Sequence, residues 1–556
     1  MKTYNRIELE SRELSQTNAK FYLILLTVFF TLSSIGIFNH EMWRDELEAW
    51  LIANNSYSLP ELSNNLRYTG HPILWYACLY LITRFTDSVW AMQLFHIIIA
   101  LSFVGLFLFY APFSKLQKFL FCFGYFTLYE YTIISRNYGL GVLFLFAFCA
   151  CYRYRARNYL PLAIILFLLS YTNAYCAIVG FALALTLIVD AYFNREQRRR
   201  LYRQRWTIIT SITIYAIGLI TSLLQMIPPA SADYRGDLID LADKTLLYTT
   251  AEDINSPFFY LRKLAQSSAT IWKAYVAIPD WSTWHFHSSN IFDLFTDSMA
   301  KVLGNITIYN GFNTLELLIY PLCIIIFTIV AISLFKKAIV LFFYLISNCA
   351  LIGFYFFVRI PNTRHTGYLF IVFLVSLWLS NNYKDSSFLA KFQPRFFNKF
   401  IPKKSSILTF FLCLHLVGGV YAYSRDIVQP FSASKAAVEY IKENNYDRLP
   451  IVGTYYVKVA PFAALLNKQI YYPESEEFGT YTVWTAQRRK NNLNITQQAI
   501  LEQTANLLND ENPEILLVLT EKLVDKIPAL KIQPLNRFEL SIIKGEVYYL
   551  YLVTKN

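Results

Sequence analysis

The chain has 556 residues, of which 55% are apolar and only 16% are charged. This composition is too apolar for a soluble enzyme of this length and is typical of a polytopic membrane protein. The formal net charge of +12 is interpreted as a topological charge that also attracts anionic membrane lipids, and we predict no nucleic-acid partner.

Apolar runs long enough to cross about 30 Å of hydrocarbon recur along the chain. The first is not followed by a small-residue cleavage site, so we interpret it as a retained span and not as a signal peptide. The sequence predicts eleven spans, near residues 21–38, 88–111, 117–134, 137–152, 159–175, 176–193, 207–227, 313–334, 338–357, 367–380 and 406–423.

A twelfth apolar run, residues 71–85, is shorter than these spans, begins with His71 and Pro72 and contains Arg84. If it crossed the membrane, every later basic block would lie outside, against the positive-inside rule. These blocks are residues 153–157, 195–205, 336–337 and 384–404. We therefore predict an interfacial or re-entrant segment and a cytoplasmic N-terminus.

This topology places two long loops, 39–87 and 228–312, and the C-terminal tail on the outer face. The tail changes composition: a helical pattern (SASKAAVEYIKENN) and a charged helix near 496–510 alternate with short strand-like runs such as LPIVGT and EILLVLT. Such alternation is typical of an α/β domain. We predict an α-helical transmembrane domain over 1–425 and a small soluble extracytoplasmic α/β domain over 426–556.

The first outer loop opens with HEMWRDELEAW, which contains Arg44, Asp45, Glu46 and Glu48. A carboxylate near the lipid boundary has an adjustable pKa and can accept a proton from an incoming hydroxyl. The alternative is that these are solvated charges at the start of a helix.

The motif SRNYGLG places Arg136 and Tyr138 at the junction of two spans. Arginine is costly at membrane depth and is usually paired or functional there. Its planar guanidinium suits a phosphate, although Glu130 is a competing structural partner.

A second cationic motif, RIPNTRHTGY, brings Arg364 and His365 to the start of the tenth span, on the outer side. Positive charge there is not explained by the positive-inside rule. A helix start also offers backbone donors to an anion. The motif therefore predicts an anion site, with binding of ordinary lipid headgroups as the alternative.

Three further polar positions carry weaker signals. His71 is either an interface residue or a binding residue. Asn173, at an outer span end, either binds substrate through a hydrogen bond or caps a helix. The pair His285 and His287 lacks a nearby acidic or cysteine ligand and is a weak metal signal.

These segments together give the chain a resemblance to the GT-C superfamily of membrane glycosyltransferases, in the bacterial branch related to protein O-mannosyltransferases and aminoarabinose transferases. The resemblance is carried by the pair Asp45-Glu46, HPILWY at 71–76, the Arg-x-Tyr motif at 136–138 and RHTGYLF at 364–370. It covers roughly residues 20–425, and the tail resembles the variable soluble domain of such enzymes.

The resemblance implies an inverting transfer of a sugar from a polyprenyl-phosphate donor to a hydroxyl of a lipid, glycan or protein at the outer face of the bacterial inner membrane. Asp45 would be the general base, and Glu46 would assist it or position the acceptor. Arg136, Tyr138, Arg364 and His365 would bind the donor phosphate, and His71 and Asn173 would bind substrate. The chain has HPI where the family has a second proline, and no obvious second aspartate follows the Arg-x-Tyr motif, so we predict no metal cofactor.

Two other function classes remain open at this point. A transporter or flippase of a lipid-linked glycan would place ionisable residues near the bilayer midplane and often shows two related halves. A surface-polysaccharide polymerase or ligase would share the compartment and the lipid-linked substrate.

Overall fold

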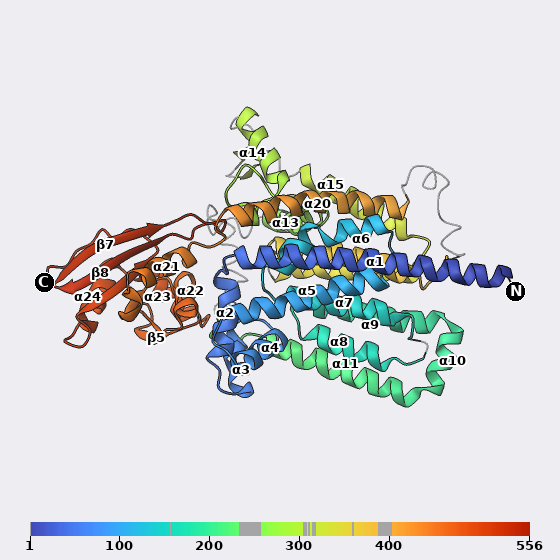
Figure 1. Cartoon of the computed structure of the whole chain (residues 1–556), viewed down its shortest axis with the longest axis horizontal. Helices are drawn as coiled ribbons and strands as arrows, with labels where there is room; N and C mark the ends of the chain where they lie inside the picture. Colours follow the sequence, from blue (N-terminus) through green and yellow to red (C-terminus); the bar gives the residue numbers. More distant parts are fainter. Residues whose placement is uncertain are drawn as a thin grey trace.

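The computed structural model describes residues 2–155, 157–232, 257–303, 308–309, 312–313, 318–358, 361–386 and 403–556. It consists of a long helical bundle with a smaller domain at one end (Figure 1). The N-terminus lies at the opposite end of the bundle from the C-terminal domain. The smaller domain holds a six-stranded sheet together with its own helices, at one end of the long axis.

Each of the eleven predicted spans contains helical structure. Among the residues that the structure describes, six helices are long and apolar enough to cross a membrane: α1 from Asn18 to its end, α5, α9, α11, α16 and α20. A helix of about 20 residues covers the hydrocarbon thickness. The bounds of the bundle helices are α1 Lys2–Asn39, α5 Trp90–Tyr110, α6 Lys115–Cys122, α7 Tyr138–Tyr152, α8 Leu160–Ser170, α9 Ala174–Phe193, α11 Arg205–Met226, α15 Ile319–Leu334, α16 Ala338–Phe357, α17 Thr363–Ser380 and α20 Lys404–Val428.

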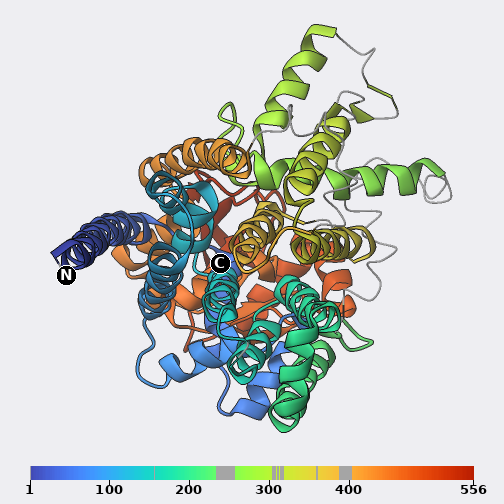
Figure 2. The same ribbon diagram turned by 90° about the vertical axis from the view of Figure 1, so that its right-hand side faces the viewer.

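The surface of the bundle carries large apolar side chains that point away from the core. Ile98, Ile188, Ile212 and Ile324 are each at least 60% exposed. Lipid tails are as apolar as these side chains, so exposure of this kind carries no cost in a bilayer. Figure 2 shows the helices nearly end-on, grouped around α7 and α17. Leu369–Leu379 of α17 are all buried, which makes α17 a central helix of the bundle.

The run predicted as one span over 117–134 is divided in the structure. Helix α6 ends at Cys122, and a π-helix, η2 (Tyr125–Ile133), follows after Gly124. Helix α20 packs against this break: a Cβ on Gly419 would lie 2.5 Å from the carbonyl oxygen of Phe123. The glycine allows the two backbones to approach closely. π-Helices are rare and are found frequently at functional sites.

Short helices cover the end of the bundle that faces the C-terminal domain. These are α2 (Arg44–Asn54), α3 (Leu59–Asn65), η1 (Leu66–Tyr68) and α4 (Leu74–Thr83). Helix α4 lies in the run 71–85 and is ten residues long, shorter than the length that spans a bilayer. The other short elements are α10 (Arg195–Arg203), α13 (Pro257–Tyr275), η3 (Phe286–Ser288), α14 (Ile291–Leu303), β1 (Ile308–Tyr309) and β2 (Phe312–Asn313).

The predicted outer loop 228–312 is therefore partly helical. Helix α13 packs against α15, α16 and α17, and His415 of α20 contacts the carbonyl oxygen of Ala274 at 3.1 Å. The polar side chains that interrupt α13 hid this helix from a search for apolar runs.

The C-terminal domain is an α/β domain, as the alternating pattern predicted. Its sheet has the order β5-β4-β3-β6-β8-β7, with β3 parallel to both β4 and β6. Strands β4 and β5 lie on one side of β3, and β6, β8 and β7 lie on its other side. Its elements are α21 (Ser434–Glu443), η6 (Tyr446–Arg448), β3 (Ile451–Gly453), α22 (Tyr456–Leu466), β4 (Ile470–Tyr472), β5 (Glu477–Gly479), α23 (Ala486–Asn494), α24 (Gln497–Leu507), β6 (Glu514–Leu519), β7 (Leu530–Phe538) and β8 (Tyr548–Lys555).

The carboxyl end of β3 faces the bundle. Helix α22 begins three residues after β3 and packs against α2 (Figure 1). A second contact joins Thr485 to Ala232 in an isolated β-bridge. In open α/β sheets, ligands bind beyond the carboxyl ends of parallel strands. The edge of the C-terminal sheet at which such sheets usually bind ligands therefore faces α2.

Candidate functional site

The candidate site is built around Asp45, in the first turn of α2. Its Oδ2 atom lies 2.7 Å from Nη2 of Arg364 and 3.4 Å from Nη1 of Arg136. Its Oδ1 atom lies 3.6 Å from Nε of Arg44. The N-terminal end of a helix also favours a negative charge. Three guanidinium groups and the helix dipole thus stabilise the ionised carboxylate, whose side chain is 20% exposed.

Two of the three guanidinium nitrogens of Arg364 have partners, since Nη2 contacts Asp45 and Nε lies 3.4 Å from Nε2 of His365. Nη2 donates to Asp45, whereas Nη1 is buried and has no hydrogen-bond partner among the described residues. The guanidinium carbon lies 5.4 Å from the centre of the Trp43 ring. A buried donor without an acceptor is costly. Nη1 therefore marks a position at which an anion would be stabilised.

Arg136 lies in the connection between η2 and α7. Besides the ion pair with Asp45, Nη1 donates to the backbone oxygen of the same residue. Its guanidinium lies 6.0 Å from the ring of Tyr138. The two arginines that the sequence predicted as phosphate ligands, 228 positions apart, are thus brought to one carboxylate, Asp45.

Tyr138 and His365 form a hydrogen bond of 2.8 Å beside this cluster. The backbone N–H of Asn362 donates to Nδ1 of His365, so a neutral imidazole carries its proton on Nε2 and donates it to the tyrosine oxygen. The imidazole also stacks on Tyr175 at 4.9 Å. Both residues are buried. This arrangement fixes the Tyr138 ring next to Arg136.

Glu46 points away from this cluster, into the interior of the protein. Oε2 accepts from Trp43 N and lies 3.1 Å from His40 Nε2, while Oε1 accepts from the backbone N–H of Ser135 at 2.6 Å. The side chain is fully buried. The structure thus gives Glu46 the geometry of a support that ties the start of α2 to the residue before Arg136, and not that of a group facing an acceptor.

His40 extends this support to the last helix of the bundle. Its Nδ1 atom lies 2.8 Å from Oδ2 of Asp426, on α20. Burial by itself lowers the pKa of the imidazole, but the two flanking carboxylates outweigh burial and raise it to about 10. The histidine is therefore a cation between Asp426 and Glu46, and the three side chains connect α1, α2 and α20.

Glu48 is a second carboxylate on the Asp45 side of α2, three residues later and hence on the same helix face. It is half-buried, and its Oε1 atom accepts a 2.8 Å hydrogen bond from the indole N–H of Trp484, in the C-terminal domain. Burial, followed by the charge of Asp45, raises the pKa of Glu48 to about 7. The sequence placed Glu48 in this acidic segment but assigned no role to it.

The two predicted substrate-binding residues lie at the margin of the site. The imidazole of His71 packs 6.5 Å from the ring of Tyr76, which is close enough to Arg136 and Glu48 to interact with their charges. Asn173 is buried and caps α9, since its Oδ1 atom accepts from Cys176 N. Its amide donates to Tyr368, which in turn donates to the backbone oxygen of Tyr138. Asn173 thus reaches the site through Tyr368.

His287, which in the sequence is only a weak sign of a metal site, lies near the cluster. Nε2 of His287 lies 3.4 Å from Oε2 of Glu130, a buried residue of the π-helix. Among the described residues, this nitrogen has no partner at hydrogen-bond geometry. The imidazole packs edge-on against Trp43. Glu130 is close enough to Arg364 to interact with its charge. Because His287 and Glu130 are 157 positions apart, no local sequence pattern could indicate this contact.

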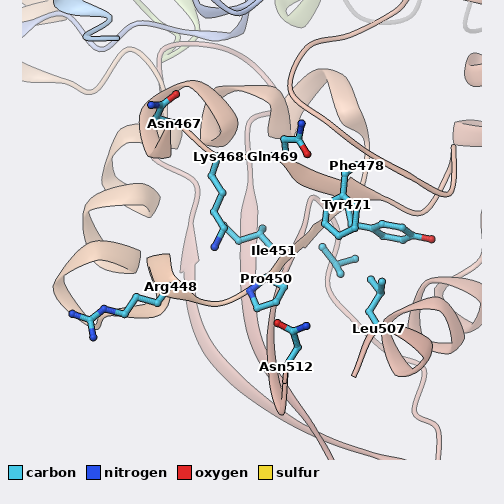
Figure 3. Close-up of a pocket in the computed structure, with 11 residues that line it drawn as sticks. Arg448, Pro450, Ile451, Asn467, Lys468, Gln469, Tyr471, Phe478, Leu507 and Asn512 are labelled. Atoms are coloured by element: carbon cyan, nitrogen blue, oxygen red, sulfur yellow. The ribbon is translucent and has the colours of Figure 1, made fainter. Parts of the chain in front are cut away.

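Within the described parts of the chain, no three His, Cys, Asp or Glu side chains come together as metal ligands would. A separate pocket of about 580 Å³ lies in the C-terminal domain (Figure 3). Pro450 and Gln469 line it, at the amino ends of β3 and β4. Ligands of parallel sheets bind at the carboxyl ends, so this pocket is not part of the site at α2.

The fold defines a multi-pass membrane protein with a cluster of arginines around Asp45 at the end of the bundle that carries the C-terminal domain. No protein-family model matches the sequence, and no curated protein matches it. Among solved structures, the chain is similar to the crystal structure of ArnT from Cupriavidus metallidurans bound to undecaprenyl phosphate. The TM-score is 0.48 and the sequence identity 8%, with 95% of this chain and 97% of that chain covered.

Proposed function

We propose that this protein is a membrane glycosyltransferase that moves a sugar from a polyprenyl-phosphate donor to a hydroxyl of a lipid, glycan or protein acceptor. The observation that carries the proposal is the guanidinium of Arg364, with one nitrogen on the Asp45 carboxylate and another buried without a partner. A phosphate at this nitrogen would bring the leaving group and a carboxylate base into one site, as transfer from a phosphate ester to a hydroxyl requires.

The donor phosphate provides the anion for Arg136 and Arg364. Arg364 is buried and the Arg136 side chain is only 11% exposed beside Asp45, where hydrogen bonds to a charged oxygen are stronger than in water. As the bond between the sugar and the phosphate oxygen breaks, negative charge grows on the phosphate, and donors already in place stabilise it. Tyr138, held by His365, fixes the edge of this phosphate site.

Asp45 is the general base in this proposal. In the structure it takes the place of an anion between the arginines, and a bound phosphate would draw the guanidinium groups toward itself. The released carboxylate oxygen can then accept the hydrogen bond of the acceptor hydroxyl. Attack of the hydroxyl opposite to the leaving phosphate inverts the anomeric carbon. Glu46 supports Asp45 through Trp43 N and Ser135 N.

The membrane provides the route for the donor. A polyprenyl chain is soluble in the bilayer, and the candidate site lies at the end of helices with lipid-facing apolar surfaces. The basic blocks at the other ends of the spans support an extracytoplasmic site by the positive-inside rule. The resemblance of the four sequence segments to the GT-C superfamily supports the same reaction class.

The first experiment measures sugar release from radiolabelled polyprenyl-phosphate sugars by purified wild-type protein, Asp45→Asn and Asp510→Asn, with cell membranes as acceptor. Asp510 is an exposed aspartate of the C-terminal domain and serves as a matched control. We expect transfer by wild type and Asp510→Asn and loss of at least about 100-fold in Asp45→Asn. Full activity of Asp45→Asn would remove it from the role of base, and no transfer by wild type from any donor would favour the transporter or flippase.

A further inference from the structure

Glu48 is placed where a second proton-accepting group would be useful to the proposed transfer. It lies on the same face of α2 as Asp45 and is close enough to Arg136, Arg44 and Tyr76 for their charges to interact. The two carboxylates differ in their partners. Asp45 is bound to three guanidinium groups, whereas the one hydrogen bond described for Glu48 comes from a neutral indole.

This difference decides which carboxylate holds a proton more readily. Guanidinium groups favour the charged form of Asp45, whereas burial and the neighbouring charge of Asp45 favour the neutral form of Glu48. Two carboxylates that share a site are driven apart in this way, and such a pair separates the roles of charged group and proton carrier. Glu130, the other acid near Arg364, is paired with His287.

The reaction itself requires a proton site next to the arginines. The acceptor oxygen forms a bond to the anomeric carbon, the bond to the phosphate oxygen breaks, and its electron pair stays on the phosphate. The phosphate thereby gains one unit of negative charge. If the hydroxyl proton moves to a carboxylate of the site, the protein side becomes more positive by one unit at the same moment. Proton transfer to Glu48 thus matches the charge of the site to that of the leaving group.

We propose that Glu48 is a further catalytic residue of the proposed transfer, on which the proton of the acceptor hydroxyl comes to rest, and that Trp484 positions it from the C-terminal domain. Asp45 takes the proton from the hydroxyl as the general base and passes it to Glu48, which holds the proton after transfer. The inference rests on the proposed function.

Trp484 is fixed well enough to act as a positioning residue. Its ring packs against Tyr456 at 6.3 Å, and the next residue, Thr485, is bridged to Ala232 of the bundle. Tyr455, directly before α22, has a φ of 63°, a left-handed conformation that is rare for an aromatic residue. Such strain is found at functional sites and persists only where the surroundings hold it.

A first test observes the proton on Glu48 directly, without relying on activity. Infrared difference spectra between pH 5.5 and 8.5 would be recorded for wild type, Glu48→Gln, Trp484→Phe and Glu502→Gln, an exposed control in α24. We expect a carboxylic C=O band with a midpoint near 7 that Glu48→Gln removes and Glu502→Gln retains. In Trp484→Phe the midpoint should move upward, because the anion loses a donor. Absence of any band that depends on Glu48 would overturn the proposal.

A second test uses the transfer assay over the same pH range. Glu48→Gln keeps an oxygen for the indole N–H, so it should fold, yet it should lose about 100-fold in kcat with little change in donor KM. Trp484→Phe should lose less and should shift the acidic limb of the pH profile upward. A Glu48→Gln protein with the wild-type rate and profile would overturn this inference alone, whereas a wild type without transferase activity overturns the proposed function as well.

Discussion

Nη2 of Arg364 donates to Oδ2 of Asp45 at 2.7 Å, whereas Nη1 of the same guanidinium is buried without a partner. The ion pair joins the start of α17 to the start of α2, so both ends of the pair lie at helix N-termini. Backbone N–H groups and helix dipoles at such positions favour anions. The relationship explains why Arg364 can hold both its carboxylate and an additional anion.

Arg364→Lys tests the geometry of this anion site. Lysine keeps the charge but has no planar fork, so it cannot bind Asp45 and a phosphate at the same time. We expect a loss in kcat of about 100-fold in the sugar-transfer assay, the size seen when one donor to a developing oxyanion is removed. Arg448→Lys, at an exposed position of the C-terminal domain, is the matched control. Equal activity of the two variants would argue against a phosphate at Arg364.

Tyr138→Phe removes the hydroxyl that His365 holds and leaves the ring in place. The hydroxyl lies 2.8 Å from Nε2 of His365 and beside Arg136, so the substitution removes a buried hydrogen bond. We expect about a tenfold loss of transfer, with the larger part in donor KM, and a fall in thermal stability in detergent. A variant with wild-type KM would show that Tyr138 supports the fold and does not contribute to the donor site.

His40→Gln tests the buried link between Asp426 and Glu46. Removal of the cation leaves two buried carboxylates uncompensated, at a cost on the order of 3 kcal/mol in the free energy of unfolding. The double variant His40→Gln, Asp426→Asn should recover part of this loss, because one buried charge is removed as well. Thermal unfolding in detergent measures both. An additive double variant would contradict the proposed pairing.

The same link gives stability a pH dependence of known sign. The pKa of His40 is raised by the two carboxylates, against the effect of burial, from 6.5 to about 10. Its stabilising contribution is therefore complete below pH 6.5 and is lost as the pH rises toward 10. We expect the unfolding temperature of wild type to fall over this interval and the fall to be smaller in His40→Gln.

Glu48 should lower the stability of the folded protein when it is ionised, whereas His40 stabilises the protein when it is charged. Because burial and Asp45 raise its pKa from 4.5 to about 7, the folded state binds the proton more tightly than the unfolded state. The carboxylate therefore destabilises the protein increasingly as the pH rises from 4.5 to 7. Glu48→Gln should be more stable than wild type at pH 8 and similar to it at pH 4.5, measured by thermal unfolding. Equal stability at both pH values would contradict the raised pKa.

The sequence predicts the helices and the chemistry of the site better than it predicts the partners within the site. Apolar runs located helical structure at all eleven predicted spans, because length and hydropathy are local properties. The strand-like runs LPIVGT and EILLVLT correspond to β3 and β6. The arginine and tyrosine motifs were found because charge at a membrane boundary is conspicuous in any sequence.

The remaining features depend on contacts that no local pattern records. Asp426 lies 386 positions from His40, and Trp484 lies 436 positions from Glu48. The burial of Glu46 could not be seen, since acids in the first turn of a helix are usually solvated and only its tertiary partners draw it inward. The division of the span 117–134 into α6 and η2 was likewise not predicted.

The contact between His40 and Asp426 also sets where the protein can be divided. Asp426 belongs to α20, which continues to Val428, so a junction at 425/426 would cut through a helix and separate an acid from its histidine. A chimera that exchanges C-terminal domains must therefore join after α20. It must also bring its own indole or amide donor to Glu48 and its own bridge partner for Ala232. A tail exchanged without the outer loops that it touches would lack both contacts, so the loops and the tail form one unit for exchange.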